Sequence, residues 1–245
     1  MTYKAFSYIE YEKILISFKD KFCKFNIYMP EEFIILRHDV EFSIERALKM
    51  AEIEASHNVK STFFFQVVSS AYNPFSVRNC EKIYRIIDLG HDVGLHFYVT
   101  HINENDNDNL RRNLERQKSL FEGGFSIDCD RFSFHRPPRW VLEKRSDTID
   151  GLINAYGESF FEFSPNPSKI KYVADSQHKW SYGHPLEHVD KTKMQILVHP
   201  DEWTKSGEER DDKFFLGLVA EAKKEFVAVI DQETKHFRKH KRLFL

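Results

Sequence analysis

The chain has 245 residues, of which 41% are hydrophobic, so it is long enough to bury one large core. Its 36 Lys and Arg residues nearly balance its 38 Asp and Glu residues, and the formal charge of -2 argues against a nucleic-acid-binding protein. The three cysteines, Cys23, Cys80 and Cys129, are far apart in sequence, which argues against a disulfide framework and against a cysteine-rich zinc motif.

The opening residues, MTYKAFSYIEYEK, carry acidic groups early and lack the unbroken apolar core of a secretory signal. No run of residues is apolar and long enough to form a membrane-spanning helix, so we expect no integral membrane segment. Together with the cysteine pattern, these features predict a cytoplasmic protein. The oligomeric state is left open by the sequence.

Helical and strand-like periods of apolar residues alternate along the chain. An amphipathic helix is predicted first, at about residues 7–22. Strands are then predicted at 33–40, 59–68, 92–99, 129–135, 169–176 and 193–200, and helices at 43–58, 77–90, 109–124 and, as one helix or two, 211–243. Ser43 is a suitable N-cap for the second helix, and Gly90 and Gly123-Gly124 are suitable stops for the next two.

Strands that alternate with helices are typical of βαβ units and a largely parallel sheet. About six to seven strands favour a barrel or a wound open sheet, and in both architectures ligands bind at the carboxyl ends of the strands. No linker rich in Pro, Gly and Ser divides the chain, which has only 9 Gly residues. We therefore predict a single α/β domain over residues 1–245, with an N-terminal helix at about 7–22 and a C-terminal helical extension at about 211–243.

Acidic residues and histidines gather where the predicted strands end. The segments concerned are Arg37–Glu41, Gly90–His96 with His101 beyond it, Phe132–Pro138, Val173–Ser176 and Ile196–Pro200. Because the ends of parallel strands meet in space, we expect these side chains to converge. Carboxylates and imidazoles are ligands of Zn²⁺ and related metals, and a metal with an open position generates a hydroxide nucleophile near neutral pH. The pattern therefore predicts a metal-assisted hydrolase.

The segments LRHDVE, STFFF, LGHDVGLHF, FSFHRPP, DSQHKW and LVHP, in this order, resemble the motifs of the polysaccharide deacetylase family, the NodB homology domain of carbohydrate esterase family 4 type. More narrowly, the first segment resembles the branch whose first motif is RHDVD. The resemblance covers about residues 33–203. It implies a distorted (β/α)7 barrel, a divalent metal that is most often zinc, and hydrolysis of an N-acyl group from an amino sugar.

The resemblance implies that Asp39 is the general base. The metal carboxylate stays open, because the adjacent Asp-Asp pair of the family is replaced by Asp39-Val40-Glu41. Residues 39 and 41 of a strand lie on the same side, so Glu41 is one candidate and Asp39 itself is the other. The purely structural alternative is a strand-end salt bridge between Arg37 and Glu41.

Two histidines complete the metal site that the resemblance implies. His96 matches the first metal histidine of the second motif. His101 is the candidate for the second, although it follows His96 by five residues where the family has four. His135 is an alternative third ligand, because it also ends a predicted strand.

Three further residues match catalytic positions of the family. Arg136, in Arg136-Pro137-Pro138, resembles the arginine that pairs with the base carboxylate, lowers its pKa and fixes its direction. His199, in LVHP, resembles the general acid that protonates the leaving amine. Asp175, with Trp180 nearby in DSQHKW, resembles the pair that orients and packs this histidine.

Trp140, Trp180 and Trp203 are candidate substrate-binding residues, because aromatic rings stack on sugar faces, although core packing is the commoner use of such rings. The predicted location favours an amino sugar made in the cytoplasm, either nucleotide-linked, lipid-linked or free, in the synthesis of a surface polysaccharide such as an O-antigen. One alternative is a hydrolase of a non-sugar amide. Another is a barrel that has lost its chemistry and binds a glycan or a partner.

Overall fold

The structure, a computed structural model, describes residues 6–99, 101–162, 169–207 and 212–237. The chain forms two compact units, Met1–Gly207 and Glu208–Leu245. Among the described residues, no helix has both the length and the apolar character that crossing a bilayer requires. The predicted organisation as one domain with two helical additions stays a prediction.

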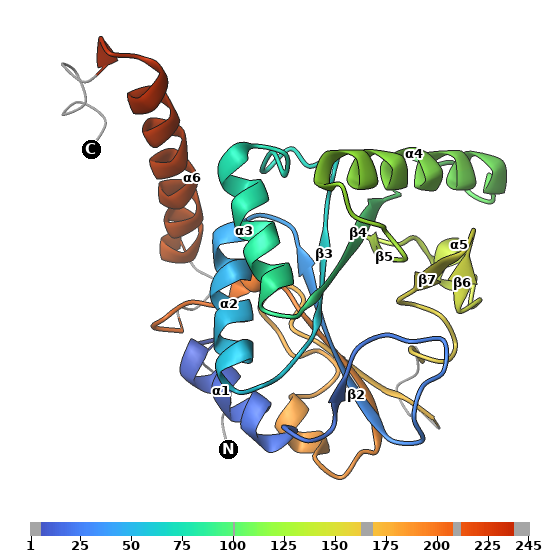
Figure 1. The fold of residues 1–245 in the computed structure, drawn as a ribbon. Helices are drawn as coiled ribbons and strands as arrows, with labels where there is room; N and C mark the ends of the chain where they lie inside the picture. Colours follow the sequence, from blue (N-terminus) through green and yellow to red (C-terminus); the bar gives the residue numbers. More distant parts are fainter. Residues whose placement is uncertain (1–5, 100, 163–168, 208–211, 238–245) are drawn as a thin grey trace. The chain divides into compact units, whose positions relative to one another are not determined.

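Helices and strands alternate through the first unit, as the periodicity predicts (Figure 1). Its helices are α1 (Tyr8–Ser17), α2 (Ile44–Ser56), α3 (Val77–Asp88), α4 (Asn107–Phe125) and α5 (Arg139–Leu142), with the 3-10 helices η1 (Pro185–His188) and η2 (Pro200–Glu202). Its strands are β1 (Phe22–Cys23), β2 (Phe33–Val40), β3 (Thr62–Phe65), β4 (Asp92–Tyr98), β5 (Arg131–His135), β6 (Thr148–Ile149), β7 (Leu152–Asn154), β8 (Lys171–Ala174) and β9 (Lys193–Val198). The second unit contains α6 (Asp212–Glu233).

The strands form one nine-stranded sheet in the order β6-β7-β5-β4-β3-β2-β9-β8, with β1 beside β2. The only antiparallel pair among the described strands is β6–β7. The sheet is curled into a half-barrel whose two end strands are β6 and β8 (Figure 1). The predicted α/β class with a parallel, barrel-like sheet is thus confirmed.

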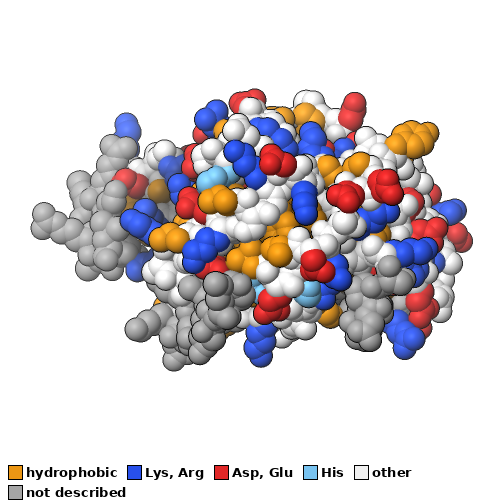
Figure 2. All heavy atoms as spheres, turned by 90° about the horizontal axis from the view of Figure 1, so that it is seen from below, with side chains coloured by type: hydrophobic (Ala, Val, Ile, Leu, Met, Phe, Trp, Pro, Cys, Tyr) orange, Lys and Arg blue, Asp and Glu red, His pale blue; other side chains and the backbone are white. Residues whose placement is uncertain are grey.

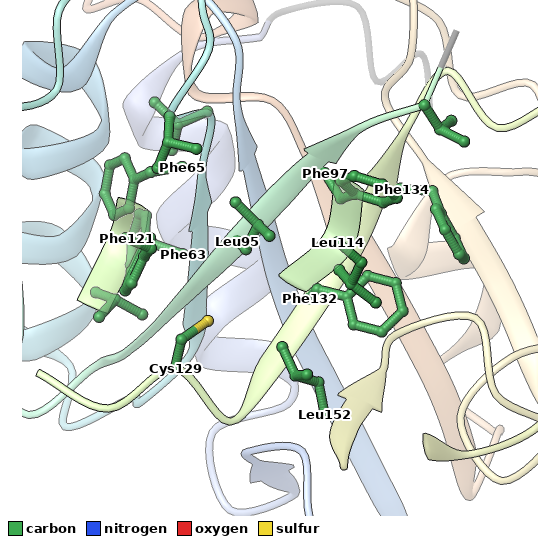
Figure 3. Close-up of a cluster of buried hydrophobic side chains, with 14 of the residues drawn as sticks. Phe63, Phe65, Leu95, Phe97, Leu114, Phe121, Cys129, Phe132, Phe134 and Leu152 are labelled. Atoms are coloured by element: carbon green, nitrogen blue, oxygen red, sulfur yellow. The ribbon is translucent and has the colours of Figure 1, made fainter. Parts of the chain in front are cut away.

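The register of the sheet separates an apolar side from a polar one. Val40, Phe65, Leu95 and Phe132 are paired across four neighbouring strands and share one side of the sheet. Figure 3 shows this side as a cluster of buried rings and aliphatic chains, to which the helices contribute Leu114 and Phe121 among others. Side chains alternate along a strand, so the residues one position away point to the opposite side of the sheet.

Local signals account for two of the helix boundaries. The Ser43 side chain accepts a hydrogen bond from the backbone N–H of Arg46 at the start of α2, as predicted for an N-cap. Helix α3 ends at Asp88, and Gly90 follows in the left-handed region with φ of 91°. Both of these predictions are confirmed.

Two other predicted boundaries are wrong. Helix α1 ends at Ser17 rather than near residue 22, because Phe22 and Cys23 pair with β2. Helix α4 does not stop at its glycines but continues to Phe125. Gly124 is required there for packing, since a Cβ atom at this position would lie 2.1 Å from the Phe75 ring.

The charged side chains of the face drawn in Figure 2 are mixed in sign. Lys and Arg side chains lie beside Asp and Glu side chains around a central apolar area. This distribution agrees with the nearly balanced composition of 36 basic and 38 acidic residues.

Candidate active site

Polar side chains from four parallel strands meet on the side of the sheet opposite the apolar cluster. They are Arg37 and Asp39 of β2, with Glu41 just beyond its end, His96 of β4, Ser133 and His135 of β5, and Gln195 of β9, with His199 just beyond its end. The register explains their proximity, because His96 pairs directly with Ser133 and the preceding Gly94 pairs with Phe64, the partner of Asp39. The predicted convergence of acids and histidines is therefore present.

Arg37 and Asp39 form a bidentate ion pair. The Nε of Arg37 donates to Asp39 Oδ1 over 2.9 Å, and its Nη2 donates to Oδ2 over 2.7 Å. The same guanidinium donates to Gln195 Oε1 over 3.1 Å and to the Tyr156 hydroxyl over 2.9 Å. Neither partner of the pair has more than 3% of its side chain exposed, so each charge depends on the other for compensation.

This pairing determines the charge state of Asp39. Burial by itself would raise the pKa of Asp39, but the charge and hydrogen bonds of Arg37, aided by the positive charge of His199, lower it to about 2. Asp39 is therefore an anion at every pH near neutrality. Its direction is fixed as well, because the Ser133 hydroxyl also donates to Oδ1, over 3.0 Å.

Glu41, His96 and His135 bring three donor atoms together, all within 4.8 Å of one another. His135 Nδ1 lies 2.9 Å from Glu41 Oε1 and 3.1 Å from His96 Nε2, and His96 Nε2 lies 3.5 Å from Glu41 Oε1. Ligand atoms at the corners of a zinc tetrahedron are ~3.4 Å apart when the metal bonds are ~2.1 Å. The spacing of this three-donor group therefore fits a small divalent cation with a fourth position open.

Ser133 determines which nitrogen of His96 carries a hydrogen. Its hydroxyl donates to the Asp39 carboxylate, and its oxygen lies 2.7 Å from His96 Nδ1. A hydroxyl has a single hydrogen, so Nδ1 of His96 must be the donor in this second bond. Nε2 then has a free lone pair facing Nδ1 of His135 at 3.1 Å, an arrangement that calls for a proton or a cation between them.

Glu41 carries the negative charge of the three-donor group. Burial would raise the pKa of Glu41, but the hydrogen bond from His135 and the positive charge of His199 hold it well below its usual range. A charged carboxylate beside two imidazoles is a ligand set that zinc and similar metals prefer. The residues present thus fit the metal that the motifs imply, with Glu41 as the carboxylate and His135 as the third ligand.

His199 faces the three-donor group from β9. Its Nδ1 lies 2.7 Å from Asp175 Oδ1, and its Nε2 lies 4.0 Å from Glu41 Oε1. Burial would lower the pKa of His199, but the charge and hydrogen bond of Asp175, with the charges of Glu41 and Asp39, raise it to about 10. The ring is therefore a cation at neutral pH, and its free N–H is directed away from Asp175.

Asp175 is held in turn by the backbone and by Trp203. It accepts hydrogen bonds from the backbone N–H of His199, at 3.0 Å to each oxygen, and from the indole N–H of Trp203 over 2.8 Å. The predicted partnership of His199 with Asp175 is present. The tryptophan that bonds to Asp175 is Trp203 and not Trp180. The Trp180 ring packs on two aromatic neighbours, with centroid distances of 6.0 Å to Phe6 and 6.3 Å to Trp203.

Two predicted site residues lie outside this arrangement. Arg136 is exposed and does not pair with Asp39, because Arg37 of the same strand as Asp39 occupies that position. His101 is also exposed, and its Nε2 lies 3.3 Å from the side-chain oxygen of Asn113 rather than in the three-donor group. The alternative salt bridge between Arg37 and Glu41 is not formed either, since the guanidinium is used by Asp39.

The three tryptophans are less available to a sugar than the sequence suggests. Trp203 has no exposed surface, so its predicted role as a substrate-binding residue is wrong, and its function is to hold Asp175. Trp140 is 8% exposed and belongs to the apolar cluster, with the Lys144 ammonium 5.5 Å from its ring centre. Trp180 is half-buried and packs against Phe6 and His184.

Sequence reasoning missed four residues that shape the site: Arg37, Ser133, Tyr156 and Gln195. A signal existed for two of them. Arg37 precedes Asp39 by two residues and Ser133 precedes His135 by two, so strand periodicity places each on the same side as its neighbour. Tyr156 and Gln195 reach Arg37 only through the order and register of the strands, which the sequence does not reveal.

Comparisons with known proteins give matches to solved structures only. No family model matches the sequence, and no curated protein sequence matches it. A CE4 family pseudoenzyme from Bacillus anthracis is 16% identical, with a TM-score of 0.47, over 79% of this chain and 61% of the other. The chain therefore spans less than two thirds of the length of this pseudoenzyme.

Two of the other similar structures are those of enzymes. A family 4 acetyl xylan esterase from Clostridium thermocellum, in complex with a cobalt ion, is 13% identical over 68% of this chain and 73% of the other, with a TM-score of 0.46. The catalytic domain of a peptidoglycan N-acetylglucosamine deacetylase from Eubacterium rectale is 13% identical over 78% and 84%, with a TM-score of 0.42. The proteins that this chain resembles in structure are thus CE4 esterases and deacetylases, together with a CE4 pseudoenzyme.

Proposed function

We propose that this protein is a metal-dependent hydrolase that removes an N-acyl group, foremost an acetyl group, from an amino sugar. One observation carries the proposal: the three-donor group of Glu41, His96 and His135 lies between a charged carboxylate and a charged imidazole. Asp39 Oδ2 is 3.7 Å from His96 Nδ1 on one side, and His199 Nε2 is 4.0 Å from Glu41 Oε1 on the other. The resemblance of the motifs to polysaccharide deacetylases supports the same function.

Zinc is the metal that this donor set favours, because two imidazoles and a carboxylate with an open fourth position are typical ligands of catalytic zinc. Glu41, His96 and His135 would hold it. When bound, such a metal polarises an amide carbonyl and lowers the pKa of water in the open position.

The residues around the three-donor group have the protonation states that amide hydrolysis needs. Asp39 stays charged through Arg37, so it accepts a proton from the attacking water. His199 stays protonated through Asp175, so its Nε2 donates a proton to the departing nitrogen. Loss of a general acid or base of this kind typically costs ~10²–10⁴ in rate.

The proposed substrate is an amino sugar available in the cytoplasm, where we place the protein. Nucleotide-linked, lipid-linked and free amino sugars all belong to this class, and synthesis of a surface polysaccharide such as an O-antigen is the corresponding process. This part of the proposal depends on analogy with the family that the motifs resemble.

A second candidate, a barrel that binds a glycan or a partner without turnover, is favoured by one feature of Asp39. Arg37 engages both of its oxygens, and its pKa of about 2 is far below neutrality. A general base works best when its pKa lies near the working pH, so Asp39 as held here is a weak one.

Release of acetate from N-acetylated amino sugars by the zinc-loaded protein tests the proposal. We expect turnover by the wild type and a loss of ~10²-fold or more in Asp39→Asn and in His199→Ala, with His101→Ala unchanged. Turnover that is equal in all four proteins contradicts the assigned roles. Binding of such sugars by the wild type, without release of acetate from any of them, supports the second candidate instead.

A further inference from the structure

Arg136 directly follows His135, a member of the three-donor group, yet the site as described does not use its guanidinium. The side chain is exposed, and it forms no hydrogen bond or ion pair with any residue that the structure describes. An arginine is always charged and presents five N–H donors in a rigid plane that matches phosphate and carboxylate oxygens. Because β5 ends at His135, Arg136 stands at the carboxyl end of the same strand, and its donor group is available there to a ligand.

The backbone of Arg136 is strained. Its φ of 48° lies in the left-handed region, which side chains with a Cβ atom rarely adopt. The next residue is Pro137, and a residue before proline is normally driven to an extended conformation. Strained residues persist where the surrounding structure imposes them, and they are concentrated at functional sites. Pro137 and Pro138 also fix two φ angles directly after Arg136, which limits the movement of the backbone there before a ligand arrives.

The segment of the chain that Arg136 begins is locally basic. Residues 136–145 contain four cations, Arg136, Arg139, Lys144 and Arg145, and one acid, Glu143, in a chain whose overall charge is -2. Glu143 accepts a hydrogen bond from Arg139 over 3.1 Å, and the Arg145 side chain donates to the backbone of Phe161. Of the arginines in this stretch, Arg136 is the one that no described residue engages.

We propose that Arg136 binds the phosphate of a phosphorylated amino sugar whose N-acyl group lies at the three-donor group. The inference rests on the proposed function and narrows its substrate class. In a sugar phosphorylated at the anomeric carbon, the phosphate is attached through one oxygen to the carbon next to the one that carries the amide. A phosphate and an amide that are so close match an arginine that follows the ligand His135 directly in the chain. Sugar 1-phosphates, nucleotide sugars and prenyl-diphosphate sugars share this chemistry.

Binding measured by calorimetry tests the proposal without any need for turnover. The probes are N-acetylglucosamine, its 1-phosphate, the UDP-linked sugar and a prenyl-diphosphate-linked sugar in neutral vesicles. We expect the wild type to bind at least one phosphorylated form about tenfold or more tightly than the neutral sugar. Arg136→Ala removes this preference, and Arg136→Lys keeps part of it. Which phosphorylated probe binds most tightly identifies the source of the phosphate.

Two controls separate phosphate recognition from structural effects. Arg139→Ala removes an exposed cation of the same segment, and we expect it to leave the phosphate preference unchanged. Arg136→Gly loses the same charge as Arg136→Ala but relieves the backbone strain, so its Tm should exceed that of Arg136→Ala by about 1–3 °C.

The proposal is overturned if the wild type binds phosphorylated and neutral sugars equally or binds neither, or if Arg136→Ala retains the preference. It is also overturned if Arg136→Ala and Arg139→Ala weaken binding to the same extent. A wild type that prefers phosphorylated sugars through Arg136 but releases no acetate leaves this inference standing and contradicts the proposed hydrolysis.

Discussion

Arg37 and Asp39 lie two residues apart on β2 and form a bidentate ion pair with donor–acceptor distances of 2.7 and 2.9 Å. The strand period makes the pair local, because residues i and i+2 share one side of the sheet. The carboxylate at the centre of the site is therefore oriented by its own strand and not by a loop from a distant part of the chain. This arrangement links the charge state of Asp39 to the integrity of β2.

Replacement of Arg37 by methionine should destabilise the fold. The variant keeps the volume of the side chain but leaves Asp39, 2% exposed, without a counter-ion. Breaking a buried ion pair in this way typically costs ~3–5 kcal/mol. Urea unfolding at pH 7 measures the loss. Since an unpaired buried carboxyl takes up a proton, the deficit should become smaller as the pH is lowered towards 4.

The matched control is the double variant Arg37→Met, Asp39→Leu, in which no charge is left unpaired. Replacement of both members of a buried pair is often neutral or stabilising, so the double variant should regain most of the lost stability. A single variant within 1 kcal/mol of the wild type would show that Asp39 does not depend on Arg37.

The three-donor group should determine metal affinity. Glu41→Gln, His96→Ala and His135→Ala each remove one ligand, and we expect each to weaken zinc binding by ~10²-fold or more. Competition with a chromophoric chelator measures the affinity, and elemental analysis gives the number of ions per chain. His101→Ala is the control, because His101 lies beside Asn113 and outside the group. Loss of zinc in His101→Ala, with His135→Ala unaffected, would reverse the assignment of the third ligand.

Ser133 should affect the metal indirectly. It bridges Asp39 and His96 and fixes the tautomer that leaves His96 Nε2 free to bind. Partners of this kind typically change metal affinity by ~10–100-fold, so Ser133→Ala should fall in that range, between the wild type and His96→Ala. Ser133→Thr keeps the hydroxyl and serves as the control for volume. An affinity equal to that of the wild type in Ser133→Ala would mean that the tautomer is set by another contact.

Much of the site could be predicted because its residues are encoded locally. Asp39, His96, His135 and His199 all lie at or near the ends of apolar strands, and parallel strands bring such ends together. The pairing of His199 with Asp175 followed from the motifs and is present at 2.7 Å.

The incorrect predictions of site residues concern side chains whose neighbours are determined only by the register of the strands and by packing. Arg136 and Arg37 are chemically equivalent candidates for the partner of Asp39. Only the direction of each side chain relative to β2 decides which of them forms the pair. His101 and His135 are likewise two candidates for the third member of the three-donor group. The pairing of Tyr98 with His135 brings the end of β5 beside the end of β4, and this register places His135 in the group. Trp203 lies close to the LVHP segment in sequence, but it packs inward on Tyr11 and Phe6. Packing of this kind depends on α1, which is far from Trp203 in the chain.

Asp175 should control the protonation of His199. In the folded protein, Asp175 is the main group that raises the pKa of His199 to about 10 against the opposing effect of burial. Asp175→Asn keeps the shape but removes the charge, so the pKa of His199 should fall by roughly 1–3 units. NMR titration of the imidazole in metal-free protein measures it. A raised histidine pKa stabilises the fold fully below pH 6.5, the pKa in the unfolded chain, and this stabilisation is lost as the pH rises to about 10. Between pH 6.5 and about 10 the variant should therefore lose less stability than the wild type.

The comparison for this prediction is Trp203→Phe, which removes one hydrogen bond to Asp175 without removing its charge. It should lower the pKa of His199 less than Asp175→Asn does. If both variants leave the titration of His199 where it is in the wild type, the raised pKa has its origin in Glu41 and Asp39 instead.

Asp201 should make the protein less stable as the pH rises towards neutrality. It is 5% exposed, and its Oδ1 has no hydrogen-bond partner among the described residues. Burial raises the pKa of Asp201 to about 7, His199 opposes this effect, and Glu41 and Glu202 add to it. The folded state therefore holds a proton between about pH 4 and 7 that the unfolded chain has already released, so stability falls across this window and is flat above it.

Asp201→Asn removes this proton linkage, and its advantage over the wild type should grow from near zero at pH 4 to about 2–4 kcal/mol at pH 8. Urea unfolding of the metal-free proteins at several pH values measures the difference. Asp190→Asn is the matched control, because it makes the same chemical change in a side chain that is 70% exposed. A constant difference between Asp201→Asn and the wild type from pH 4 to 8 would mean that Asp201 is ionised in the folded protein throughout this range.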